Sequence, residues 1–204
     1  MPDRTTVTAS PPADSAPLAG CEVVVGVTAG IAAFKAAALV SLLVQRGAAV
    51  TAVLTRNARK FVGEATFAAL TGRPVATRGF DPSAFPLGGH IELASRADLI
   101  VVAPASADFL AKVAHGLADD LLTTLILCAE CPVVHAPAMN SAMWAKPAVQ
   151  RNVEQVRLDG GTIISPGTGW LSCRQSGAGR MAEPEEILSA VARLLPTASR
   201  RAGS

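Results

Sequence analysis

The chain has 204 residues, half of them hydrophobic, and a formal net charge of +2 at pH 7. This length favours one domain with a large apolar core, and the charge gives no reason to expect nucleic acid or an anionic membrane as a partner. The longest apolar helical stretch, residues 31–44, contains Lys35 and is too short to cross a bilayer. The first twenty residues lack the apolar segment of a secretory signal, so the sequence predicts a cytoplasmic protein.

Apolar runs typical of strands alternate with helical patterns along the chain. The sequence predicts strands at residues 22–27, 49–54, 98–103, 132–136 and 162–165, and helices at 31–46, 61–70, 109–115, 119–129, 147–158 and 184–195, with a short helix from residue 90. This alternation indicates an α/β protein: a single domain built on a doubly wound parallel sheet, Rossmann-like or flavodoxin-like. The domain is expected at 21–195, between a disordered N-terminal tail (1–20) and a C-terminal tail (196–204).

Residues 72–89 predict a long loop, because they hold three prolines and four glycines. Long loops in a compact domain are usually functional or mobile. His90 follows at the expected N-terminus of the next helix, a position that favours a neutral imidazole. A catalytic histidine and an ordinary cap or surface histidine are both open at this point.

Residues 166–183 also lack a helical or strand period, and predict a flexible loop or flap. Cys173 lies there between Ser172 and Arg174, with Arg180 a few residues further on. Nearby cations stabilise a thiolate, so Cys173 is the best candidate for a reactive thiol, although an inert thiol is the alternative.

The other cysteines predict no site. Cys128 and Cys131 form a single C-x-x-C pair, without a second pair or histidines at ligand spacing. No metal site is therefore expected, and these thiols are interpreted as structural or incidental.

The ends of two predicted strands carry residues suited to anions. Thr28-Ala29-Gly30 leads from the first strand directly into a helix, which places backbone N–H groups and a helix N-terminus where a phosphate can bind. The spacing Gly26-x-x-x-Gly30 is not the dinucleotide fingerprint, and a plain tight turn is the alternative. The third strand ends in Pro104-Ala-Ser-Ala-Asp, whose hydroxyl and carboxylate suit either a helix N-cap or a phosphate and ribose contact.

The strand at 132–136 delivers an amide, a thioether and an indole to the segment that follows it. Pro137 ends the apolar run, and Met139, Asn140 and Trp144 then lie on an expected irregular loop. Ligands bind beyond the carboxyl ends of strands in open α/β sheets, so the segment predicts a site. A turn asparagine is the simpler alternative.

Several of these segments together resemble the flavin-containing cysteine decarboxylases. They are Gly26-Val-Thr-Ala-Gly-Ile-Ala-Ala, His90-Ile-Glu-Leu, Ala103-Pro-Ala-Ser-Ala, Gly116-Leu-Ala-Asp-Asp-Leu-Leu-Thr, Pro137-Ala-Met-Asn-Ser-Ala-Met-Trp, and Cys173 ahead of Gly179-Arg-Met-Ala-Glu-Pro. The resemblance covers residues 21–195 in order, and the Pro-Ala-Met-Asn-x-x-Met-Trp block is its most specific part. Within the family, the chain is most similar to the branch that acts on 4'-phosphopantothenoylcysteine in coenzyme A biosynthesis.

The resemblance implies an FMN-dependent carboxy-lyase. FMN oxidises the substrate cysteine to a thioaldehyde, carbon dioxide leaves because the carbanion is delocalised as an enethiolate, and the enethiol is then reduced to 4'-phosphopantetheine. By the family pattern His90 is the base of the oxidative step, and Cys173 donates the proton of the final reduction. Asn140 binds the substrate carboxylate and cysteine amide, with Met139 and Arg180 as further substrate contacts. The positions that match FMN contacts are Gly30, Ile31, Ala32, Thr55, Ser106, Ala107, Asp108, Phe109 and Ala138.

The resemblance also implies partners. FMN is expected at a subunit interface of a homotrimer or a multiple of trimers, and the substrate is a small-molecule thiol. No synthetase domain is seen in the chain, so the phosphopantothenate–cysteine ligase is expected to be a separate protein.

The chain departs from this branch in two places. Ser172-Cys173-Arg174 stands where Ala-Cys-Gly is usual, and Ala94-Ser95 precedes a single arginine where adjacent arginines are usual. One alternative is therefore oxidative decarboxylation of a peptide's C-terminal cysteine to an aminoenethiol, although such relatives generally lack the flap cysteine. A remote third is a non-catalytic FMN-binding protein that inhibits a phosphatase, but those relatives tend to carry long acidic tails.

Overall fold

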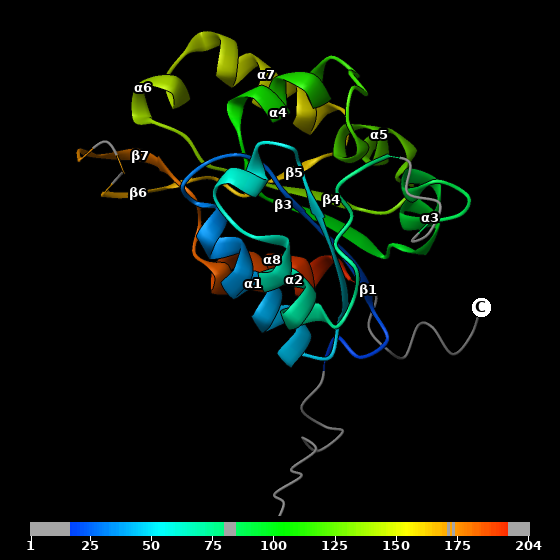
Figure 1. Ribbon diagram of the computed structural model, residues 1–204. Coiled ribbons are helices and arrows are strands. Elements are labelled where there is room, and N and C mark those ends of the chain that lie inside the picture. Colours follow the sequence, from blue (N-terminus) through cyan, green and yellow to red (C-terminus); the bar gives the residue numbers. More distant parts are fainter. Residues whose placement is uncertain (1–16, 80–84, 171, 173, 196–204) are drawn as a thin grey trace, which may run out of the picture.

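The computed structural model describes residues 17–79, 85–170, 172 and 174–195. Its centre is a parallel sheet of five strands in the order β2-β1-β3-β4-β5 (Figure 1). The strands are β1 (Glu22–Val27), β2 (Ala49–Leu54), β3 (Leu99–Ala105), β4 (Val133–Pro137) and β5 (Thr162–Ile163). The strand order reverses between β1 and β3, which in doubly wound sheets marks the crevice where ligands bind. The predicted flavodoxin-like α/β fold is confirmed.

Helices cover both faces of the sheet (Figure 1). One face packs against α1 (Ala33–Gln45), α2 (Glu64–Thr71) and α8 (Pro184–Leu194), with a short 3-10 turn, η2 (Ala58–Lys60), before α2. The other face packs against α3 (Gly89–Arg96), α4 (Ala107–Ala114), α5 (Leu121–Cys128) and α7 (Pro147–Leu158). In the part of the chain that the structure describes, no helix combines the length and apolar character needed to span a membrane.

Successive residues of the central strands belong to opposite cores. Leu99 and Val101 of β3 pack into the core that α1 and α8 cover, whereas Ile100 and Val102 pack into the core that α4 and α5 cover. A strand buried on both faces reads as a continuous apolar run instead of an alternating one. This is why the sequence pattern identified the strand correctly.

Residues 166–183 are not the irregular loop that the sequence predicts. Gly167–Trp170 (β6) and Ser176–Arg180 (β7) pair as an antiparallel hairpin that extends from the body of the domain (Figure 1). Its residues are mostly glycine, serine and threonine, and most are exposed or half-buried. Backbone pairing therefore holds the hairpin without the apolar alternation by which strands are recognised.

The segment after β4 also differs from the predicted irregular loop, because Ser141–Trp144 form a one-turn helix, α6. The side chain of Asn140 caps this helix, with Oδ1 accepting a hydrogen bond from the amide of Ala142 at 2.8 Å. An asparagine at an N-cap stabilises such a turn, although four residues are too few to leave a helical period in the sequence.

The folded domain begins before residue 21. Leu18 is buried in the core under α1 and α8, and its amide donates a hydrogen bond to the carbonyl of Arg46 at 3.0 Å. The sequence places Leu18 in a tail because one leucine among Pro, Ala and Gly residues gives no pattern. The rest of both predicted tails, residues 1–16 and 196–204, lies outside the described residues.

His135 on β4 is a buried histidine with an unsatisfied nitrogen. It is 1% exposed, and its Nδ1 has no hydrogen-bond partner among the described residues. The ring centroids of His135 and Phe109 lie 6.0 Å apart, and a Cβ on Gly161 would come within 3.3 Å of the imidazole. Removal from water disfavours the charged ring and lowers the pKa of His135 to about 4. The imidazole therefore packs as a neutral, nearly apolar ring.

We expect His135→Leu to remove part of the acid sensitivity of folding. Because the folded pKa is about 4 against 6.5 for the free side chain, the unfolded chain binds more protons in between. The free energy of unfolding therefore falls as the pH drops through this window, by about 2 kcal/mol from pH 8 to pH 5 for this group. Urea unfolding of both proteins at the two pH values measures the effect. At pH 8 the histidine is neutral in both the folded and the unfolded chain, so the difference between the two proteins there reports the change in packing. The same pH dependence in both proteins would contradict the prediction.

Candidate functional site

A cavity of about 570 Å³ opens at the carboxyl ends of β1, β3 and β4. Its volume falls in the range of pockets that bind small molecules and cofactors. The wall is formed by residues 29–32 after β1, 106 and 107 after β3, and 138–140 after β4, together with parts of α1, α6 and the hairpin. Each of these segments directly follows a strand of the same parallel sheet or packs beside one that does. The cavity therefore lies where this fold places ligands.

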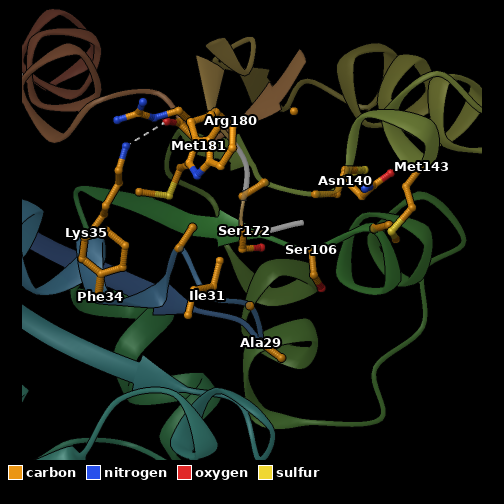
Figure 2. A pocket seen from close by; sticks show the side chains of 17 residues that line it. Ala29, Ile31, Phe34, Lys35, Ser106, Asn140, Met143, Ser172, Arg180 and Met181 are labelled. Carbon is orange, nitrogen blue, oxygen red and sulfur yellow. Dashed lines mark hydrogen bonds between the residues drawn. The ribbon is translucent and has the colours of Figure 1, made fainter. Parts of the chain in front are cut away.

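The turn between β1 and α1 forms one wall. A Cβ on Gly30 would meet no atom within 4 Å, so this backbone borders open space. Ile31 and Phe34 are 60% and 62% exposed, and both lie beside the cavity (Figure 2). Exposed backbone before a helix offers N–H groups to an anion, and the apolar side chains offer a surface to an aromatic ring. This wall thus suits a ligand that carries both an anionic group and an aromatic ring.

The start of α4 forms the second wall. Ser106 caps this helix, with Oγ accepting a hydrogen bond from the amide of Phe109 at 3.2 Å, and Ser106 and Ala107 both line the cavity. Asp108 instead has an exposed side chain with a carboxylate oxygen 3.5 Å from Nζ of Lys112. The side chain of Phe109 is buried in the core. Of the four matched FMN positions here, the first two face the cavity.

The segment after β4 forms the third wall. Ala138, Met139, Asn140 and Met143 line the cavity, and Figure 2 shows Asn140 and Met143 on the side opposite α1. Met143, and not the neighbouring Trp144, takes this place because the turn of α6 directs successive residues to different sides. Trp144 packs against the core that α4 and α7 share. The polar group of this wall is therefore the Asn140 amide, oriented by its bond from the α6 backbone.

The hairpin forms the fourth wall of the cavity, and a backbone hydrogen bond holds the end of β7 in place. The amide of Met139 donates a hydrogen bond to the carbonyl of Gly179 at 2.9 Å. Gly179 has φ +118°, and a Cβ there would overlap the carbonyl oxygen of Met139, so only glycine fits. Trp170 and Ser172, further along the hairpin, line the cavity. The hairpin is thus docked by its backbone onto the segment that carries Asn140.

Three charged side chains meet beside the base of the hairpin. Lys35 is 8% exposed, and its Nζ donates to Glu183 Oε1 at 2.8 Å and to the carbonyl of Met181 at 3.4 Å, the latter dashed in Figure 2. Arg180 Nη2 lies 2.9 Å from the same carboxylate oxygen. The hydrogen bond from Lys35 lowers the pKa of Glu183 below its ordinary value. Two cations around one anion leave this edge positive, which favours an anionic ligand.

Besides Asp108 and Phe109, two more of the described site residues that the sequence predicts do not line the cavity of the single chain. His90 is the second residue of α3, on a different part of the surface. Thr55 follows β2, where its Oγ1 accepts a hydrogen bond from the amide of Ala58 at 3.3 Å. Cys173 lies outside the described residues, although its neighbour Ser172 lines the cavity. The roles of these three residues stay predictions.

Several lining residues gave little signal in the sequence. The sequence did not single out Phe34, Met143 and Met181 as site residues, because an apolar side chain does not reveal which cavity it faces. Lys35 gave the clearest signal, since it is a single charge inside an otherwise apolar helical stretch. Such a buried charge needs a partner, here the exposed carboxylate of Glu183.

Comparison with known proteins identifies relatives along most of the chain. Residues 13–196 match the family model described as Flavoprotein. The coenzyme A biosynthesis bifunctional protein CoaBC of Mycobacterium bovis is 49% identical over 175 residues, which cover 85% of this chain and 41% of the relative. That of Vibrio cholerae is 45% identical over 172 residues, 84% of this chain and 43% of the relative. The chain thus spans about two-fifths of the length of these curated relatives.

Solved structures agree with this assignment. The FMN-dependent cysteine decarboxylase SpaF is 37% identical with a TM-score of 0.75, over 87% of this chain and 96% of that chain. A PPC decarboxylase carrying a cysteine-to-serine mutation, complexed with pantothenoylaminoethenethiol, is 32% identical with a TM-score of 0.75, over 84% and 96%. The resemblance to flavin-containing cysteine decarboxylases is therefore confirmed in both sequence and fold. By its family match and its architecture, this chain belongs to the Flavoprotein family.

Proposed function

We propose that the protein is an FMN-dependent carboxy-lyase that converts 4'-phosphopantothenoylcysteine to 4'-phosphopantetheine in coenzyme A biosynthesis. The observation that carries this proposal is the cavity, which joins an anion-accepting turn, an apolar surface and the Asn140 amide at the carboxyl ends of one sheet. The names of the CoaBC relatives and of the PPC decarboxylase support this substrate. The proposed pathway partner is the ligase activity that supplies the cysteine-containing substrate.

The cavity lining fits FMN. The backbone around Gly30 would hold its phosphate, and Ile31 and Phe34 offer apolar surface for its ring system. The positive edge at Lys35 and Arg180 suits the anionic groups of cofactor and substrate. When bound, FMN supplies an acceptor for two electrons of the substrate cysteine and returns them after carbon dioxide has left. SpaF and the FMN binding protein AtHal3 are FMN proteins of the same fold, which supports this cofactor.

Asn140 is the residue proposed to hold the substrate carboxylate. Its Oδ1 accepts a hydrogen bond from the amide of Ala142, and the NH₂ group of the same side chain is a donor of the kind that binds a carboxylate oxygen. Orientation of the carboxylate by this donor, with the hairpin excluding water, would favour loss of carbon dioxide. Cys173 is proposed to donate the proton that completes reduction of the enethiol carbon.

His90 is proposed to act in the cavity of a neighbouring copy. It does not line the cavity of its own chain, and the exposed apolar side chains of Leu87 and Ile91 flank it. Ile31 and Phe34 expose apolar surface at the cavity. Exposed apolar groups at both places suit an interface between copies. We therefore propose a homotrimer, or a multiple of trimers, with His90 of one subunit as the base in the next.

The alternative is oxidative decarboxylation of a peptide's C-terminal cysteine. The similarity to SpaF, an FMN-dependent cysteine decarboxylase, favours this reading. The two reactions differ at the last step, because an aminoenethiol product needs no final protonation by a thiol. The presence of Cys173 in the sequence, directly after the lining residue Ser172, supports the first reaction.

The purified protein is expected to bind FMN, giving a yellow solution, and to convert 4'-phosphopantothenoylcysteine to carbon dioxide and the saturated thiol. In Cys173→Ser, the product should stop at the unsaturated enethiol, because the proton donor of the last step is missing. Mass spectrometry of the products identifies both, with a cysteine-ended peptide as competing substrate. A protein that takes up no FMN would defeat the proposal, and turnover of the peptide alone would favour the alternative.

Asn140→Asp is expected to lower kcat/KM at least about 100-fold while the protein stays folded, because a negative oxygen replaces the donor that faces the substrate carboxylate. Aspartate caps a helix as well as asparagine does, so the thermal midpoint should change little. Asn152→Asp on α7, away from the cavity, is the control and should keep wild-type kinetics. A kcat/KM for Asn140→Asp close to wild type would argue against the role.

Mixed oligomers of two inactive variants, His90→Asn and Asn140→Asp, are expected to recover activity. Where His90 of one subunit serves its neighbour's cavity, some cavities combine both intact residues, and random mixing makes about one quarter of them active. Co-expression of differently tagged chains, with kinetics on the purified mixture, measures this, and light scattering gives the oligomer mass. No gain over the single variants would place His90 and Asn140 in the same chain's site.

A further inference from the structure

Thr28 joins two of the turns that line the cavity. It follows β1, directly before Ala29 and Gly30, and is 2% exposed. Its Oγ1 donates a hydrogen bond to the carbonyl of Pro104 at 2.7 Å and accepts one from the amide of Ser106 at 2.9 Å. The amide of Thr28 also donates to the carbonyl of Pro104, at 3.3 Å. One buried hydroxyl thus satisfies two backbone groups that lie 76 and 78 residues further along the chain.

The connection continues across the other walls of the cavity. The amide of Ala138 donates to the carbonyl of Ala105 at 3.1 Å, and the amide of Met139 donates to the carbonyl of Gly179 at 2.9 Å. These bonds tie the turn after β3 to the segment after β4, and that segment to the hairpin. Both bonds are between backbone atoms, whereas the link from β1 to β3 includes the Thr28 side chain. A substitution at Thr28 can therefore weaken this link and leave the atoms of the others in place.

The hydroxyl affects ligand-binding residues without lining the cavity itself. Thr28 is absent from the wall, but Gly30 and Ser106, on either side of its hydrogen bonds, belong to it. Without the hydroxyl, the N–H of Ser106 would lose its partner, and Pro104 would keep only the longer bond from the Thr28 amide. Unpaired buried groups are costly, and the turns can relieve that cost by moving apart so that water enters. The cavity would then be widened between its first and second walls.

We propose that Thr28 is a positioning residue that sets the affinity of the cavity for FMN by holding the β1–α1 and β3–α4 turns together. The inference rests on the proposed function, because it takes FMN as the occupant. If only a fraction of molecules keeps the turns together, the apparent affinity falls to that fraction of its full value. Thr28 needs no contact with the cofactor for this effect.

The test compares Thr28→Val with a matched buried threonine. Thr51 on β2 is also buried, and its Oγ1 accepts a hydrogen bond from Arg73 Nη1 at 3.3 Å, but it does not line the cavity or its turns. We expect Thr28→Val to raise the Kd for FMN about tenfold, which corresponds to about 1.4 kcal/mol. Thr28→Ser keeps the hydroxyl and should stay within about threefold of wild type, as should Thr51→Val. Fluorescence titration of FMN with apoprotein gives Kd, and visible circular dichroism reports the environment of the bound ring.

The outcomes separate this inference from the proposed function. Equal FMN affinity for Thr28→Val and Thr51→Val, with a wild type that binds FMN, would overturn the role of Thr28 and leave the proposed function standing. A wild type that binds no FMN would overturn both. If Thr28→Val does not fold, Thr28→Ala is held to the same tenfold criterion, because it removes the hydroxyl without adding a methyl group at its place. If neither folds, hydrogen exchange in the wild type decides: bound FMN should slow exchange of the Ser106 amide, and an unchanged rate would overturn the proposal.

Discussion

The parallel pairing of β1 with β3 is the constraint on which the rest of the site depends. The two strands align from Val23 opposite Leu99 to Gly26 opposite Val102, and both are buried on two faces. A shift of register by one residue would exchange the side chains of the two cores, so apolar burial fixes this alignment. As a result the strands end side by side, and the turns that follow them are brought within reach of one hydroxyl, that of Thr28.

The sequence was sufficient to predict the strands of the sheet, because strands buried on both faces appear as continuous apolar runs, such as residues 98–103 and 132–136. It was insufficient where hydrogen bonds hold a segment together without an apolar pattern. The hairpin of β6 and β7 has glycines where strands usually have branched or aromatic residues, and α6 depends on one cap from Asn140. Neither interaction has a period that a sequence pattern can register.

The site was predicted best where its residues follow a strand end, as Gly30, Ser106 and Asn140 do. It was predicted less well where the direction of a side chain decides whether a residue lines the cavity. In α6, for example, Met143 faces the cavity whereas the next residue, Trp144, packs against the core. Phe109 illustrates the same limit, since it adjoins lining residues in the sequence yet packs beside His135. Positions that depend on another copy of the chain, as proposed for His90, leave no mark in the pattern of a single sequence.

Arg174, near the end of the hairpin, has a backbone conformation that is unusual for a residue with a side chain. Its φ is +62°, a left-handed conformation that glycine adopts freely and that a residue with a Cβ adopts at a penalty of about 1–2 kcal/mol. The resemblance to the decarboxylases leads one to expect glycine at this position, which fits the positive φ, and the arginine adds a guanidinium to a backbone of that conformation. Because the hairpin is docked at Gly179, we expect the penalty at Arg174 to lower the free energy of unfolding and not to change where the hairpin docks. A change of side chain at Arg174 can therefore alter the charge near the end of the hairpin and leave the docking of the hairpin at Gly179 in place.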